Sequence, residues 1–327
     1  MPNESSLFHA SILGFALLAS AAAGDLRISG PYTHDNLSIF LIHRAGSDTG
    51  KNFLTLQEAM EEKKVVVYET GNVNQLAIEN LSSEEVYIQS GDIVKGGRQD
   101  RVFSDDMVLT SHSGRIPIAS FCVEHGRWTK RGSEASDRFS TTNNTVAGKS
   151  LKMAVRDKKD QREVWDQVAR AQVSMSMAAP EFRAPASNSM QLAMENRNVA
   201  EATGAYVSSL KKIVDGKPDV VGYAFAINGK VNSADIYASS DLFRKMWPKL
   251  LNSSAVEAFT ERPNMKGSAK VDVSAVESAI AAADRGRESA QPPMGSVQTV
   301  KKESDKVLLF ESRETGKGWI HKNYVVK

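Results

Sequence analysis

Short apolar runs separated by polar turns are the feature that most limits how the first half of this chain can fold. Each run is too short for an ordinary helix, and several alternate apolar with polar residues, as half-buried strands do. The chain has a single cysteine, Cys122, so no intrachain disulfide can hold these strands together. A hydrophobic content of 41% is enough for a core that holds them instead. The runs are residues 37–43, 65–69, 76–78, 86–88, 93–94, 102–103, 107–109 and 116–123.

The second half combines helices with a hairpin and two late strands. Apolar residues recur at three- and four-residue steps over 160–177 and 199–213, which predicts a helix over each range. Asn228 and Gly229 tolerate the positive φ of a tight turn, so the strands that flank them are predicted to form a β-hairpin. The hairpin strands are 220–227 and 230–237, further helices are expected over 240–251 and 273–284, and the late strands over 307–310 and 318–326.

These elements predict an α+β fold, with an antiparallel β-rich N-terminal lobe followed by a helical and β-hairpin C-terminal lobe. The first lobe would span residues 24–178 and the second residues 190–327. Residues 179–189 contain Pro180 and Pro185 and are predicted to be the linker between the lobes. Within the second lobe, residues 285–296 are expected to be a flexible stretch.

The N-terminus indicates export. Residues 10–23 are an uninterrupted run of small and apolar residues, which has the length of a signal-peptide core and is too short to span a membrane. Residues 1–23 are therefore predicted to be a signal peptide cleaved between Ala23 and Gly24, which gives a periplasmic or secreted protein. The alternative is a buried N-terminal helix. No later segment is apolar for long enough to predict a transmembrane span.

Several function classes lack support in the sequence. The formal net charge of +2 is too small for a protein whose whole surface binds nucleic acid. The glycine-rich positions do not form a phosphate loop, and no Gly-x-Ser-x-Gly or His-Glu-x-x-His motif occurs. The six histidines are far apart in sequence. We therefore predict no cofactor and no metal site, and protein partners stay unknown.

The segment 91–131 is the best candidate for a binding site, because it gathers more basic than acidic side chains in a nearly neutral chain. Paired glycines can turn the backbone tightly and expose amide donors, and guanidinium groups bind carboxylates and phosphates in a bidentate manner. An indole beside them offers a stacking surface. We predict a cleft for a small anionic ligand, with the binding residues Gly96, Gly97, Arg98, Gln99, Asp100, Arg101, Glu124, Arg127 and Trp128.

The same residues have a structural interpretation. Asp100 and Glu124 would each hold an arginine in an ion-pair network that locks two loops, with Trp128 as a core aromatic. A catalytic interpretation is also open, in which Glu124 is a general base or Cys122 is a nucleophile whose pKa is lowered by His125 or Arg127. The protein would then be a hydrolase. A third class is a structural envelope protein without a cleft.

Two motifs in this segment resemble a bacterial family, the ARG and rhodanese-phosphatase superfamily associated protein domain. The matching residues are Gly91-Asp92, Gly96-Gly97-Arg98-Gln99-Asp100-Arg101, Ile116-Pro117 and Cys122-Val123-Glu124-His125-Gly126-Arg127-Trp128. The similarity extends over most of the chain after residue 23, including Trp247-Pro248-Lys249-Leu250-Leu251.

The resemblance implies no established activity and no catalytic residues. The family name records gene association with ADP-ribosylglycohydrolases and rhodanese-phosphatases. That association implies an ADP-ribose-like or other phosphate-containing substrate, should the protein be a hydrolase.

Overall fold

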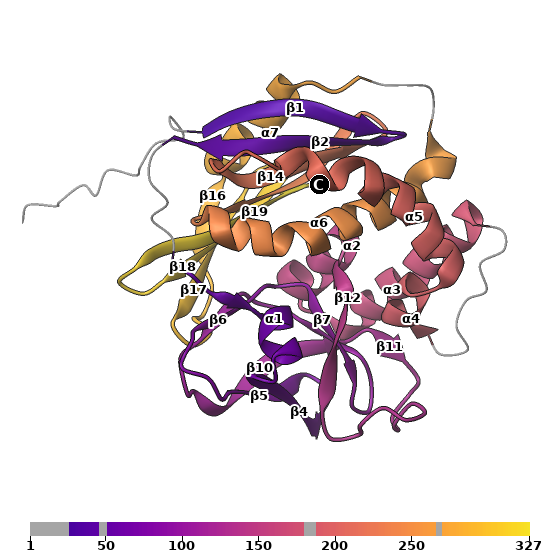
Figure 1. Ribbon diagram of the computed structural model, residues 1–327, viewed down its shortest axis with the longest axis vertical. Coiled ribbons are helices and arrows are strands. Elements are labelled where there is room, and N and C mark those ends of the chain that lie inside the picture. Colours follow the sequence, from indigo (N-terminus) through magenta and orange to yellow (C-terminus); the bar gives the residue numbers. More distant parts are fainter. Residues whose placement is uncertain (1–25, 46–50, 180–187, 266–269) are drawn as a thin grey trace, which may run out of the picture.

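The computed structural model describes residues 26–45, 51–179, 188–265 and 270–327, without the side chains of residues 143 and 144. The fold is α+β, as expected, and its sheets are antiparallel apart from one short parallel pair. Figure 1 shows two β regions at opposite ends of the molecule, with helix α6, Ser240–Glu261, between them. The predicted signal peptide lies outside the described residues.

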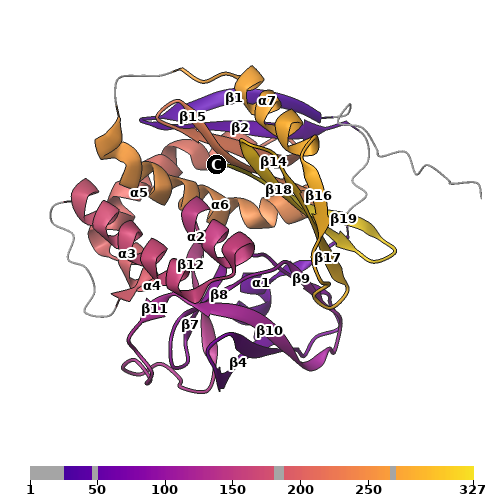
Figure 2. The same cartoon turned by 180° about the vertical axis from the view of Figure 1, so that it is seen from behind.

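Strand β2, Leu37–Arg44, illustrates how the larger sheet is built. Side chains at alternate positions point to opposite faces of a strand, and in β2 both faces are apolar and buried. Leu41 packs into the core that contains α6, whereas Phe40 and Ile42 pack into the core that contains helix α7, Val273–Asp284. The sheet is therefore covered on both faces. Figure 2 shows α7 on the outer face of this sheet, away from the second β region.

The larger sheet joins the two ends of the chain. The hairpin predicted around Asn228 and Gly229 is confirmed, because Ile227 pairs with Lys230. The strand order is β1 (Leu26–His34), β2, β14 (Val220–Ile227), β15 (Lys230–Tyr237), β19 (Gly318–Val326), β18 (Val307–Glu314), β17 (Val297–Glu303) and β16 (Arg287–Ala290).

The second β region contains the segment predicted to bind a ligand. Many of its apolar side chains form a separate core beneath helix α1, Leu56–Glu61, which begins with a Thr55 and Glu58 capping box. Others, such as Ile93 and Val102, pack into the core that contains α6. The six-stranded sheet has the order β12 (Phe139–Val146), β7 (Asp92–Gly96), β8 (Arg101–Phe103), β10 (Gly114–Cys122), β5 (Gln75–Asn80) and β4 (Val65–Asn72). The smaller sheets are β3 (Leu54–Thr55), β6 (Val86–Ile88) and β9 (Met107–Leu109), and β11 (Glu124–His125) with β13 (Asn188–Ser189).

Helices fill the space between and beside the sheets. Asp160 caps the predicted helix over 160–177, and Asn196 caps the next one. The remaining helices are α2 (Lys149–Lys152), which continues as a π-helical segment (Met153–Lys158), α3 (Gln161–Ala178), α4 (Met190–Met194) and α5 (Arg197–Leu210).

The topology differs from the predicted division into two lobes. Residues 26–44 were assigned to the first lobe, yet β2 pairs with β14 in the sheet of the second. Periodicity identifies a strand but not its partner, so the sequence could not show this pairing. Residues 285–296 include strand β16, paired with β17 at the sheet edge, where all four residues of β16 are exposed and carry no apolar pattern. Of the predicted linker, residues 180–187 lie outside the described part.

Candidate functional site

The two glycines of the first motif lie in a tight connection between β7 and β8. Gly97 has φ of +54°, and a Cβ there would stand 2.4 Å from Cζ of Phe139 and 2.9 Å from Oε2 of Glu69. Only glycine fits this close approach. The amide donors are used within the protein, since Gly96 N donates to Asp100 at 3.0 Å and Gly97 N donates to the carbonyl oxygen of Ala135 at 3.1 Å.

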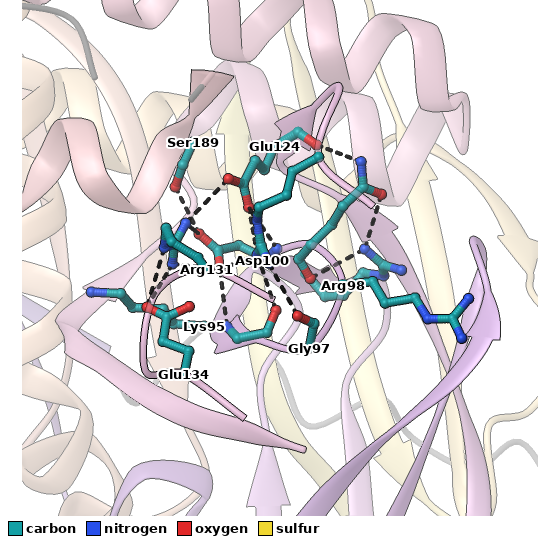
Figure 3. A network of polar contacts seen from close by, with 12 residues as sticks. Lys95, Gly97, Arg98, Asp100, Glu124, Arg131, Glu134 and Ser189 are labelled. Carbon is teal, nitrogen blue, oxygen red and sulfur yellow. Dashed lines mark hydrogen bonds and ion pairs between the residues drawn. The ribbon is translucent and has the colours of Figure 1, made fainter. Parts of the chain in front are cut away.

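Asp100 is fully buried at the centre of a polar network (Figure 3). Arg131 donates to both of its carboxylate oxygens, each at 3.1 Å, and Ser189 Oγ donates to Oδ2 at 2.7 Å. Arg127 Nη2 lies 3.4 Å from Oδ1. Asp100 therefore ties the glycine motif to β13, far along the chain.

Glu124 is the second fully buried carboxylate of this network. Arg127 Nε donates to its Oε2 at 2.7 Å, and Arg131 Nη1 donates to Oε1 at 3.2 Å. The backbone N–H of Asp100 also donates to Oε2. Burial raises the pKa of Glu124, but the hydrogen bond and charge of Arg127, helped by Arg131, outweigh burial and lower that pKa. Asp100, Glu124, Arg127 and Arg131 thus satisfy one another, as the ion-pair interpretation expected.

Arg131 is the member of this network that the predicted binding set omits. It also donates to Glu134 Oε1, at 3.0 Å from Nη2, and Figure 3 shows it between that carboxylate and Asp100. Its sequence neighbourhood is polar and irregular, so only its basic character could have suggested a role. Gln99 has a similar internal function, because its side-chain amide donates to the backbone carbonyl of Glu124 at 2.8 Å.

Arg98, Arg101 and Trp128 form a separate group at the rim of the network, which we call the rim site. The Trp128 ring centroid lies 5.4 Å from Cζ of Arg98 and 5.8 Å from Cζ of Arg101. Trp128 is 41% exposed, so it is not the core aromatic of the structural interpretation. Arg101 itself is fully buried.

The hydrogen bonds of Arg101 are incomplete. Nη1 donates to the backbone oxygen of Gln99 at 3.2 Å and to its side-chain oxygen at 3.3 Å. Within the described part of the chain, Nε and Nη2 have no hydrogen-bond acceptor. Glu69 Oε2 lies 3.7 Å from Nη2, which is an ion pair but too long for a hydrogen bond. Buried donors left without acceptors are costly, so this guanidinium is the unusual feature of the rim site.

The side chains proposed for catalysis make contacts that do not activate them. Cys122 is buried, and burial raises the pKa of its thiol to about 11. Its Sγ is 3.7 Å from the carbonyl oxygen of Val73. His125 is exposed and its ring packs edge-on against Trp165, with 4.4 Å between centroids. These contacts give Cys122 no activating base and leave Glu124 ionised between arginines.

A second buried polar cluster, not predicted from the sequence, links the two β regions, and we call it the interior cluster. His321 lies between Asp106 Oδ2 at 3.0 Å and Asp235 Oδ1 at 2.9 Å, and Arg156 Nη2 lies 3.2 Å from the same oxygen of Asp106. Burial lowers the pKa of His321, but Asp106 and then Asp235 outweigh burial and raise it. These residues are far apart in sequence, and each is unremarkable in its own context. We interpret the cluster as a charged structural link between the two β regions.

The described residues contain no group of three or more histidine, cysteine, aspartate or glutamate side chains placed to hold a metal ion. Over the same residues, no helix has the length and apolar character needed to cross a membrane.

Comparisons with known proteins give one match. A comparison with curated proteins found none, and neither did a comparison with solved structures. A family model matches residues 25–326, which is nearly the whole chain and includes both motifs, the interior cluster and both ends of the larger sheet. The chain therefore belongs to the family described as the ARG and Rhodanese-Phosphatase-superfamily-associated Protein domain.

Proposed function

We propose that this protein binds a small anion, a carboxylate or a phosphate, at the rim site of Arg98, Arg101 and Trp128. The observation that carries the proposal is the pair of unsatisfied donors on buried Arg101. Nε and Nη2 lie on one edge of the guanidinium, and this edge forms the parallel, bidentate pair with carboxylate and phosphate oxygens.

Glu69 does not occupy this edge. Its Oε2 accepts the backbone N–H of Arg98 at 3.0 Å, and its Oε1 accepts those of Thr70 and Gly71. These backbone bonds hold the Glu69 carboxylate in place, with Oε2 3.7 Å from Arg101 Nη2. A ligand oxygen at hydrogen-bond distance would remove the cost of the unpaired donors, which is about 1–3 kcal/mol for each buried group.

Trp128 and Arg98 are suited to admit and hold such a ligand. The indole covers Arg101 while remaining 41% exposed, so a rotation of this side chain opens the guanidinium to solvent. Arg98 is exposed on the same ring and adds a second cation. The family's gene association favours a phosphate-containing ligand over a simple carboxylate.

The test is a titration with inorganic phosphate and, separately, with ADP-ribose, followed by calorimetry and by tryptophan fluorescence. Arg101→Lys keeps the charge but removes the bidentate edge, so we expect it to weaken binding by about tenfold or more, which corresponds to about 1.4 kcal/mol. Arg27→Lys, at an exposed arginine on β1, is the control and should bind as the wild type does. Equal affinity of wild type and Arg101→Lys for both probes would refute the rim site.

Three other predictions accompany this one. Export with cleavage after Ala23 stays a prediction, and N-terminal sequencing of protein recovered from the periplasm or medium tests it. Hydrolysis through Glu124 or Cys122 and a purely structural envelope role also stay predictions. The contacts of Glu124 and Cys122 described above give hydrolysis no support, which is why binding is preferred.

A further inference from the structure

A groove of about 790 Å³, which shares no lining residue with the rim site, lies between α3, α4, α6 and the β14–β15 hairpin. Its volume is in the range of pockets that enclose small organic ligands. The segments that line it come from five separate parts of the chain, so no sequence motif marks it. Nothing in the proposed anion binding uses any of these side chains.

The inner polar end of the groove presents hydrogen-bond acceptors. Glu257 on α6 accepts the backbone N–H of Lys149 at 3.1 Å through Oε1 and the side-chain N–H of Asn232 at 3.3 Å through Oε2. Asn232 is 9% exposed, and its Oδ1 has no hydrogen-bond partner within the described residues. Because the Asn232 nitrogen donates to Glu257, this orphan oxygen can only accept.

The backbone at Gly148 lies close to the carboxylate of Glu257. A Cβ on Gly148 would stand 3.0 Å from both Cδ and Oε1 of Glu257, closer than ordinary van der Waals contact, so a larger residue there would press on this carboxylate. Burial is the largest influence on the pKa of Glu257 and raises it, against the hydrogen bond from the Lys149 backbone and the charges of Lys152 and Lys149. The carboxylate is therefore short of compensating positive charge, which a cationic ligand would supply.

Apolar and flexible side chains form another part of the groove wall, beside polar ones. Met175, Met190 and Met194 line one side, and Val256 and Leu151 line others. Methionine side chains are flexible and polarizable, so they pack against aliphatic or aromatic bodies of different shapes. Three cationic side chains also line the groove. Arg170 and Lys230 are exposed, where solvent screens their charge, and the charge of half-buried Lys149 lowers the pKa of Glu257 without offsetting its burial.

We propose that this groove binds an organic ammonium compound with an apolar body. Its N–H groups donate to Glu257 and to the orphan Oδ1 of Asn232, and its body lies against the methionines. An ammonium provides up to three donors and a charge, which matches two adjacent acceptors of which one is a carboxylate.

The experiment uses three probes that share one apolar body: phenethylamine, 2-phenylethanol and 3-phenylpropanoate. Calorimetry with the full chain should show binding of the amine, with the alcohol and the carboxylate at least about tenfold weaker. Stronger binding of the carboxylate or equal binding of the alcohol would overturn the ammonium assignment. No binding of the amine at millimolar concentration would overturn the site itself.

Two variants locate the site. Glu257→Gln keeps the size of the side chain and should weaken amine binding by about tenfold or more. Glu277→Gln is the control, because Glu277 is exposed on helix α7 and does not line the groove. It should change the affinity by no more than about twofold. Circular dichroism verifies that both variants are folded, and equal losses in folded Glu257→Gln and Glu277→Gln would refute the assignment to Glu257.

Discussion

The buried network around Asp100 predicts a large loss of stability when its charge is removed. Asp100→Asn preserves the shape of the side chain but replaces one acceptor oxygen with an NH₂ donor. The oxygens of Asp100 accept hydrogen bonds from Gly96, Arg131 and Ser189, so the new donor must face another donor. Arg131 and Arg127 then keep their positive charges but lose the negative charge of Asp100, with which both form ion pairs.

The magnitude follows from burial. Removing one partner of a fully buried ion pair costs about 3–5 kcal/mol. Asp100 is fully buried, but the side chains of Arg127 and Arg131 are 10% and 18% exposed. Water reaches the arginines in part, so the lower end of that range, about 3 kcal/mol, is expected. Glu134→Gln is the control, since this carboxylate pairs with the same Arg131 but is 24% exposed and should cost about 1 kcal/mol or less.

Urea unfolding followed by circular dichroism and by tryptophan fluorescence measures both variants. The midpoint should fall in Asp100→Asn at an unchanged slope, and the two signals should coincide. In the double variant Asp100→Asn with Arg131→Met, the loss should be smaller than the sum of the single losses, because the unpaired cation is gone. A cost below about 1 kcal/mol for Asp100→Asn would refute the structural role assigned to this network.

Three further predictions concern other parts of the molecule. His321→Gln tests the interior cluster: because the folded pKa of His321 is raised above 6.5, the stability from its charge is complete below that pH and is lost as the pH rises through the folded pKa. Unfolding free energies should therefore fall above pH 6.5, by at most about 1.4 kcal/mol per pH unit, in the wild type but not in the variant. Cys122 should react with a thiol reagent in the native protein far more slowly than after denaturation, since burial raises its pKa to about 11; rapid native labelling would revive the nucleophile hypothesis. Gly97→Ala should destabilise by about 2 kcal/mol more than Gly132→Ala, because both glycines have similar positive φ but only Gly97 has neighbours within 4 Å; equal losses in thermal melts would show that close approach is not the reason for Gly97.

Local pattern predicted much of the secondary structure. The helices over 161–178 and 197–210 and the hairpin at Asn228 and Gly229 follow from spacing and turn chemistry, which act between near neighbours in sequence. The placement of residues 26–44 in the sheet of the second half did not follow, because strand pairing across the chain depends on tertiary packing.

The segment 91–131 stands out in the sequence for its basic side chains, but the contacts that each of them makes could not be predicted. Whether an arginine meets a carboxylate or solvent depends on loop geometry that composition does not specify. Arg127 is satisfied internally, whereas Arg101 keeps two free donors, although both stand in similar motifs. No local sequence pattern indicates the groove at Glu257, because its acceptors come from two separate elements, α6 and β15.

The pairing of β2 with β14 also constrains the order in which this chain can fold. His43 on β2 contacts Asp219, 176 positions further along the chain. Strand β2 is therefore synthesised long before β14, the strand with which it pairs. Closing a loop of that size is slow, and the larger sheet cannot be completed until the last strands have left the ribosome. Cutting the chain between residues 179 and 189 would therefore yield two fragments that each lack part of one sheet, and not two independent domains.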